Sequence, residues 1–203
     1  NGCGKSTLLK TMARLIKPLS GDIVIDGKKI TTMSSKKLAQ ILGLLPQSPV
    51  VPEGITVWDL VSRGRFPYQN LFSSLNKEDF EAVEEALEIM GISELANRCI
   101  DELSGGQRQA LSLLMATLKR PELLLLDEHT AALDPKTSVA LMKLTDEFVT
   151  RDHLTALMIT HHMEDALKYG NRLIVMKDGQ IIKDLTKEEK DQLDITDYYA
   201  MFE

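Results

Sequence analysis

The chain has 203 residues, of which 43% are hydrophobic, and its formal net charge at pH 7 is −6. A chain of this size can bury the core of one domain, and its dispersed Lys and Arg residues exclude a basic nucleic-acid surface or a lipid-binding patch. Two cysteines, Cys3 and Cys99, are too few for a disulfide framework, so a reducing compartment is expected.

The first residues carry a phosphate-binding pattern, since they match the end of Gly-x-x-x-x-Gly-Lys-[Ser/Thr] without its first glycine and one further residue. The segment comprises Asn1, Gly2, Cys3, Gly4, Lys5, Ser6 and Thr7. Its amides would surround the β-phosphate, Lys5 would reach the β- and γ-phosphates, and Ser6 would bind magnesium. An amphipathic helix ending at Pro18, with Leu8, Leu9, Met12, Ala13 and Ile16 on its apolar face, is expected to follow. This context favours nucleotide binding over a plain glycine-rich turn.

The next stretch predicts a hairpin, a helix and a strand. Residues 21–30 alternate apolar and polar side chains around an Asp26-Gly27 turn. A short helix over 34–40 precedes a strand over 42–45 that stops at Pro46. Gln47 then stands at the strand end, where taken alone it is most simply a solvated loop residue.

Helices dominate the prediction for residues 48–100. Thr56 and Asp59 form a capping-box pattern for one helix, and the segment 63–68 breaks it. Asn76 caps a second helix, which ends at Gly91 and has Phe80, Val83, Leu87 and Met90 facing inward. The aromatic and arginine side chains of 63–72 could either pack this region or contact a partner, and the sequence leaves both open.

Residues 101–128 combine a helix start with a buried strand. Ser104, Gly105 and Gly106 begin a helix that reaches about Lys119, and a helix N-terminus next to two glycines suits a phosphate. Leu123–Leu126 predicts a buried parallel strand that ends in two carboxylates. Asp127 is placed to reach magnesium and Glu128 to accept a proton from an attacking water. Taken alone, the first part could also be an ordinary turn into a helix, and the second a solvated strand end.

The remaining sequence predicts further α/β structure. Asp134 and Pro135 form an N-cap and first-turn pair for a helix. An apolar strand over 154–159 is followed by His161 and His162, and a lone histidine in such a place more often packs than catalyses. A hairpin over 172–183 turns at Lys177-Asp178-Gly179, and a polar helix over 187–192 comes before the C-terminal tail.

Together these motifs, in this order and over essentially the whole chain, resemble the ATP-binding cassette (ABC) ATPases. Residues 101–107 are similar to the signature motif, in which Ser104, Gly105, Gly106 and Gln107 contact nucleotide, and 123–128 to the Walker B strand. The resemblance implies that Gln47 contacts magnesium and the attacking water, and that His161 bonds the γ-phosphate. It also implies that Asp134 belongs to a loop that would cross to a partner subunit. His129 replaces the proline usual in this family and is assigned no chemistry.

The resemblance also implies an architecture and partners. We expect an α/β P-loop fold with a mostly parallel sheet, in which residues 1–47 and 105–203 form the core and 48–104 a helical subdomain. ATP and Mg²⁺ would bind in a head-to-tail homodimer or heterodimer of ATPase subunits. The subunit would lie at the cytoplasmic face of the membrane, bound to permease subunits and served by a substrate-binding protein. The initial strand and an adenine-stacking aromatic residue are missing, so a fragment of a longer protein is expected.

Two family branches are visible. Residues 21–110 resemble the ATPases of iron-siderophore, haem and vitamin B12 importers, while 111–203 resemble an amino-acid-type or uncharacterised importer branch. Iron chelates are favoured as the transported substrate, because in this family the helical subdomain determines which permease the ATPase binds. The alternatives are an amino-acid-type importer, a binding-only remnant, and a non-transport ATPase of repair or translation. The short stretch between P-loop and signature, without a long coiled coil or a second cassette, argues against repair and translation.

Overall fold

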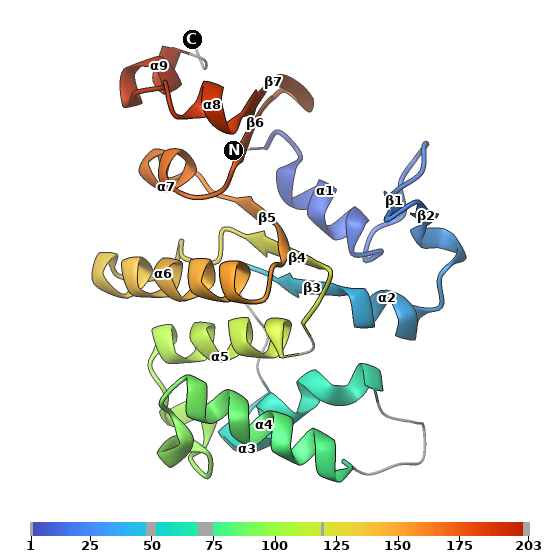
Figure 1. The fold of residues 1–203 in the computed structure, drawn as a ribbon, viewed down its shortest axis with the longest axis vertical. Coiled ribbons are helices and arrows are strands. Elements are labelled where there is room, and N and C mark those ends of the chain that lie inside the picture. The colour runs from blue at the N-terminus through green and yellow to red at the C-terminus, as the bar shows by residue number, and fades with distance from the viewer. Residues whose placement is uncertain (1, 48–51, 69–74, 119, 201–203) are drawn as a thin grey trace. The chain divides into compact units, whose positions relative to one another are not determined.

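The computed structural model describes residues 2–47, 52–68, 75–118 and 120–200. The chain divides into two compact units, a terminal unit of Asn1–Gly21 with Met158–Glu203 and a central unit of Asp22–Leu157. Both combine helices and strands (Figure 1). The predicted α/β class is confirmed, and the predicted subdomain division at 48–104 stays a prediction.

The central unit is built on a parallel pair of strands. β3 (Leu42–Leu45) lies beside β4 (Leu123–Asp127), with Leu42 opposite Leu123 and Leu45 opposite Leu126. All five residues of β4 are buried, as expected of a strand covered on both faces. Both strands were predicted, including the end of β3 before Pro46. A third strand, β5 (Thr155–Ile159), spans the boundary between the two units.

Helix α5 (Gly105–Thr117) is the central packing element of this unit (Figure 1). It contacts β3, α3 (Val57–Ser62) and α6 (Pro135–Arg151), while α2 (Ser35–Ile41) also contacts β3. The approach of α5 to β3 is close enough to require glycine, because a Cβ at Gly43 would lie 2.6 Å from the carbonyl oxygen of Ala116. The helix that carries the signature therefore packs directly on the strand that precedes Gln47.

The region between β3 and α5 is helical in its described residues, as predicted. It contains α3, the 3₁₀ segment η2 (Arg63–Tyr68), α4 (Lys77–Ile89), η3 (Ser93–Leu95) and η4 (Ile100–Glu102). Capping boxes at Thr56 and Asn76 start α3 and α4. One expectation is wrong: Phe80 is 45% exposed rather than inward. Its ring stacks on that of Trp58, with centroids 5.6 Å apart.

The predicted hairpin near residue 26 is present but short. β1 (Val24–Ile25) pairs with β2 (Lys28–Lys29) in antiparallel fashion, and η1 (Ile30–Thr32) follows. Asp26 and Gly27 both have positive φ, 49° and 74°, which is the geometry that closes a two-residue turn of this type. The alternating pattern over 21–30 thus overstates the length of the strands.

The terminal unit contains α1 (Lys5–Met12), α7 (Met163–Lys168), the β6–β7 hairpin (Arg172–Lys177 and Gln180–Thr186), α8 (Lys187–Lys190) and α9 (Ile195–Ala200). Ala166, Leu173 and Val175 form a buried cluster. The hairpin turns at Asp178 and Gly179, as predicted. Helix α1 ends at Met12 rather than near Pro18, because Arg14 adopts a left-handed conformation with φ of 58°.

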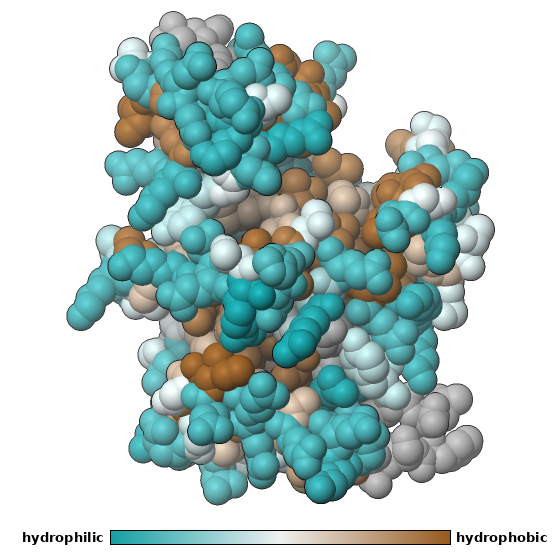
Figure 2. Space-filling model, in the orientation of Figure 1, coloured by the Kyte–Doolittle hydropathy of each residue, from teal (hydrophilic) through white to brown (hydrophobic). Residues whose placement is uncertain are grey.

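The exposed surface is mainly hydrophilic on the face drawn in Figure 2, where apolar side chains appear in separate patches. Large apolar side chains that are exposed include Phe66, Tyr68 and Ile89 in the helical region. Among the described residues, no helix is both long and apolar enough to cross a bilayer.

Candidate functional site

The phosphate-binding segment has the backbone conformation that its glycines predict. Gly2 and Gly4 have φ of 84° and 85°, and Gly4 caps α1 in the left-handed region. A Cβ at either position would meet no described atom within 4 Å, so the surrounding space is open to a ligand. By helix geometry the first amides of α1 point out of its N-terminus, a direction that suits an anion. Asn1 lies outside the described residues.

Lys5 points back into this loop. Its Nζ donates to Sγ of Cys3 at 3.1 Å, and this hydrogen bond to the ammonium holds the pKa of the Cys3 thiol below its ordinary value. A lysine held over the loop is suitably placed to meet an anion bound there. The role of Lys5 and Ser6 toward phosphates and magnesium remains a prediction.

The signature residues form the N-terminus of α5. Ser104 Oγ accepts from the amide of Gln107 at 3.2 Å, and Gln107 Oε1 accepts from the amide of Ser104 at 2.9 Å. This capping box occupies the Ser104 and Gln107 side chains, while the helix N-terminus keeps its partial positive charge. The arrangement fits a phosphate site formed by backbone groups.

The two signature glycines differ in their surroundings. A Cβ at Gly105 would meet no described atom within 4 Å, whereas a Cβ at Gly106 would lie 2.3 Å from Cγ2 of Thr137. Gly106 is therefore needed for packing of α5 on the start of α6, and Gly105 leaves open surface for a ligand. The same contact brings the signature next to Asp134, which caps α6 by accepting from the amide of Thr137 at 3.1 Å. Hydrogen bonds from Thr137 hold the pKa of Asp134 below its ordinary value.

The end of β4 places the two predicted carboxylates side by side in the chain but in different settings. Asp127 is buried at the last strand position, and Glu128 is partly buried in the turn that follows. Glu128 has φ of 47°, an uncommon conformation for a residue with a side chain. Its Oε2 lies 3.4 Å from Nε2 of Gln47. The structure thus joins two of the predicted catalytic residues within the central unit, although sequence separates them by 81 positions.

His161, the predicted γ-phosphate ligand, is exposed after the end of β5. Its ring stacks on that of His162 at a centroid distance of 4.7 Å, and the amide of His162 donates to Oγ1 of Thr160 at 3.0 Å. His161 is therefore a surface side chain rather than a packed one. The contact of His161 with nucleotide stays a prediction. The meeting of Lys5 and Ser6 with Asp127, which belongs to the other unit, also stays a prediction.

The donor chemistry of the predicted magnesium ligands fits the ion. Ser6, Gln47 and Asp127 offer hydroxyl, amide and carboxylate oxygens, which are the hard ligands that magnesium prefers. Within the described ranges no group of three His, Cys, Asp or Glu residues could hold a metal. Magnesium commonly binds through one or two protein ligands with substrate phosphates completing its shell, so this donor set suits an ion that arrives with nucleotide.

Three residues next to the site form a group that the sequence does not predict. Gln109, His129 and Thr145 are buried polar side chains from three different segments, and they are connected by hydrogen bonds. His129 breaks the family pattern, which was the only hint available. Because the contacts join residues 16 and 20 positions apart, no local pattern could have paired them.

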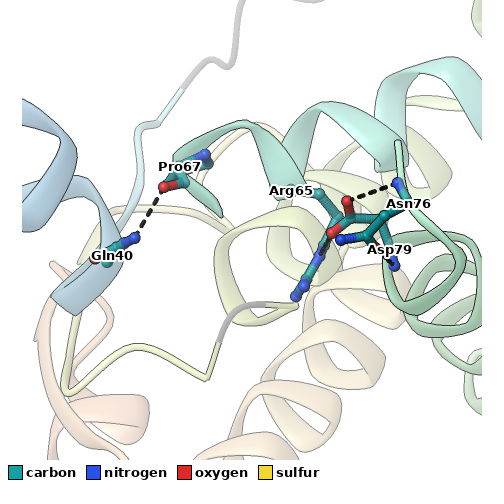
Figure 3. Close-up of polar contacts among 5 residues, drawn as sticks. All are labelled: Gln40, Arg65, Pro67, Asn76 and Asp79. Atoms are coloured by element: carbon teal, nitrogen blue, oxygen red, sulfur yellow. Dashed lines mark hydrogen bonds and ion pairs between the residues drawn. The ribbon is translucent and has the colours of Figure 1, made fainter. Parts of the chain in front are cut away.

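The structure assigns Arg65 of the 63–72 segment to packing (Figure 3). Its Nε donates to Oδ1 of Asp79 at 2.8 Å, and the two side chains are only 16% and 4% exposed. The Arg65 guanidinium also lies 4.6 Å from the ring centroid of Tyr68, and the Pro67 carbonyl accepts from Gln40 Nε2 at 2.9 Å. Phe66 and Tyr68 remain 59% and 41% exposed. Phe72 lies outside the described residues.

Comparison with known proteins identifies the family. Residues 1–131 match the family model described as ABC transporter. The chain is 43% identical over 189 residues to the iron(3+)-hydroxamate import ATP-binding protein of Bacillus subtilis, covering 93% of this chain and 70% of that protein. It is 39% identical over 216 residues to a tyrosine transport ATP-binding protein of Clostridioides difficile, covering 100% of this chain and 83% of that one.

Comparison with a solved structure supports the same family. The dimeric ATP-binding cassette bound to ADP and phosphate in a post-hydrolysis state superposes with a TM-score of 0.76 at 29% identity, over 92% of this chain and 82% of that one. The chain belongs to the ATP-binding subunits of ABC transporters. Within that family it is an ABC ATPase domain, as the order of its motifs predicted.

Proposed function

We propose that this chain binds ATP with magnesium and hydrolyses it in a head-to-tail dimer of ATPase subunits, and so drives a membrane permease. The observation that carries the proposal is the strand end of the central unit, where Gln47 lies within 3.4 Å of Glu128. A carboxylate with a neighbouring amide is suited to hold and deprotonate a water. The open glycine backbone before α1 and at Gly105 provides the surfaces for phosphates.

In this proposal each residue has a separate task. Lys5 and the loop amides hold the β- and γ-phosphates, and the N-terminus of α5 from the partner subunit meets the γ-phosphate from the opposite side. Glu128 accepts the proton of the attacking water, Gln47 orients that water, and His161 donates to the γ-phosphate. Ser6, Gln47 and Asp127 would hold magnesium, which when bound would supply neutralisation of the charge on the phosphates.

For the transported substrate we propose a ferric siderophore or related iron chelate. Support comes from the hydroxamate-import relative and from the enterobactin relative of Escherichia coli, which is 41% identical over 182 residues. The second candidate is an amino acid such as tyrosine, because the tyrosine-transport relative aligns with the whole chain. The subunit would act at the cytoplasmic face of the membrane, together with permease subunits and a substrate-binding protein.

The test is reconstitution of the protein with the permease and the substrate-binding protein that the proposal assigns to it. ATP-dependent uptake into proteoliposomes is measured with a ferric hydroxamate, the same siderophore without iron, and tyrosine. Uptake of the ferric form alone would support the proposal, and uptake of tyrosine alone would replace it with the second candidate. ATP hydrolysis that no permease stimulates would contradict a role in transport.

A further inference from the structure

The residue after the candidate base Glu128 is a buried histidine, His129, which is hydrogen-bonded to two helices. His129 is 2% exposed. Its backbone carbonyl accepts from Nε2 of Gln109 in α5 at 2.8 Å, and its ring Nε2 lies 3.1 Å from Oγ1 of Thr145 in α6. Gln109 and Thr145 are themselves 6% and 4% exposed. The backbone carbonyl and the ring Nε2 of His129 are therefore hydrogen-bonded to two different helices.

The direction of the second hydrogen bond follows from the other partner of Thr145. Thr145 Oγ1 donates to the carbonyl of Leu141, one turn earlier in α6, at 2.8 Å. We assign the single proton of this hydroxyl to the Leu141 carbonyl, so that its oxygen accepts from His129. In this assignment His129 donates from Nε2, which sets its tautomer.

Glu128 needs such support because its backbone is unfavourable by itself. Its φ of 47° places a residue with a Cβ in the left-handed region. Such conformations persist where surrounding contacts determine them. Here the turn is closed by the amide of Ala131, which donates to the Glu128 carbonyl at 3.0 Å, and the next residue is anchored by α5 and α6.

We propose that His129 is a positioning residue for Glu128, acting through the Gln109–His129–Thr145 hydrogen bonds, which we call the anchor. The inference rests on the proposed function, in which Glu128 is the general base. The Gln109 hydrogen bond holds the backbone carbonyl of His129, and the Thr145 hydrogen bond holds its ring. The anchor holds the peptide that follows Glu128 against two helices, and it thereby sets the orientation of the Glu128 side chain.

The test removes one acceptor without changing shape. Thr145→Val leaves the His129 Nε2–H unpaired, Thr145→Ser retains the hydroxyl, and Thr117→Val is the matched control. Thr117 is also a buried helical threonine, but its hydroxyl donates to Leu113 and Leu114 of its own helix. In the full-length protein, Thr145→Val should lower kcat for ATP about ten- to a hundredfold, the range expected for misplacing a catalytic group. KM and ATP affinity should stay within about threefold of wild type.

The rescue and a second background decide the outcome. Thr145→Ser should restore kcat, Thr117→Val should leave it unchanged, and Thr145→Val should have no further effect on kcat in a Glu128→Gln background. Unchanged kcat in Thr145→Val, or a loss that Thr145→Ser does not rescue, would overturn the inference. If Thr145→Val does not fold, Gln109→Leu severs the anchor from α5 with the same expectations. Full activity of Glu128→Gln would instead refute the proposed base, whatever the anchor variants do.

Discussion

Glu128 is the side chain on which hydrolysis should depend most directly. Glu128→Gln keeps the shape of the residue and its contact with Gln47 but removes the proton acceptor. Since a general base typically contributes about 10²–10⁴ in rate, kcat should fall by that range while ATP binding is retained. Single-turnover hydrolysis and equilibrium ATP binding of the full-length protein measure the two quantities. Near-normal turnover would exclude Glu128 as the base.

His129 predicts a pH dependence of stability. Burial lowers its pKa from an ordinary 6.5 to about 4, so the unfolded chain binds a proton more readily than the folded one. The stabilisation is complete above pH 6.5 and is lost as pH falls toward 4, because the unfolded state then takes up the proton first. Between pH 6.5 and pH 4, protonation of His129 in the unfolded state should lower the free energy of unfolding by about 3 kcal/mol.

The measurement is denaturant unfolding from pH 7 to pH 4 without magnesium, on wild type and His129→Gln. Their difference isolates this group, since all other titrating residues are shared. The wild type should lose more stability on acidification than the variant does. A difference that is constant with pH would contradict a buried neutral histidine.

At the scale of elements, variants of the η2 segment distinguish residues that pack the helical region from residues that contact a partner. Arg65→Ala leaves the Asp79 carboxylate, whose side chain is 4% exposed, without its cation. Breaking a buried pair from one side costs about 3–5 kcal/mol, and the bond from the Asn76 amide at 3.1 Å to Asp79 places the expected loss near the lower end. Tyr68→Ala removes an exposed ring and a contact worth about 1 kcal/mol or less.

Thermal unfolding, basal ATPase activity and permease-stimulated activity of both variants distinguish the roles. Arg65→Ala should lower Tm markedly. Tyr68→Ala should barely change Tm, and it should reduce only the stimulated activity if the exposed aromatic side chains contact the permease. A large drop in Tm for Tyr68→Ala would assign that residue to packing as well.

The same elements show how far the sequence could be taken. Capping at Thr56 and Asn76 and the strand end at Pro46 depend on neighbouring residues, so they were predictable. The end of α1 and the exposure of Phe80 were not, because they depend on what each side chain packs against. The same distinction applies to the site. Sequence motifs identified Gln47 and Glu128 but not the short distance between their side chains. The contacts Arg65–Asp79 and His129–Thr145 are created only by the tertiary fold.

For the whole molecule, the proposed head-to-tail dimer predicts complementation between two defective chains. Lys5→Ala disables the phosphate loop of its own chain, and Gly105→Asp places a carboxylate where the partner's γ-phosphate would lie. Gly105 is the better target than Gly106, since a Cβ there meets no described atom within 4 Å and an acidic residue suits the first turn of a helix. Each variant alone should be inactive as a homodimer.

Mixing the two variants decides between the pairings. In a head-to-tail dimer of the two variants, one site contains both substitutions and the other contains neither. Because about half of randomly paired dimers are mixed, about a quarter of all sites should be intact. If P-loop and signature of one chain served the same site, every site would keep a lesion and mixing would restore nothing. ATPase activity of the co-purified pair, against the doubly substituted homodimer as control, therefore tests whether each site is shared between two subunits.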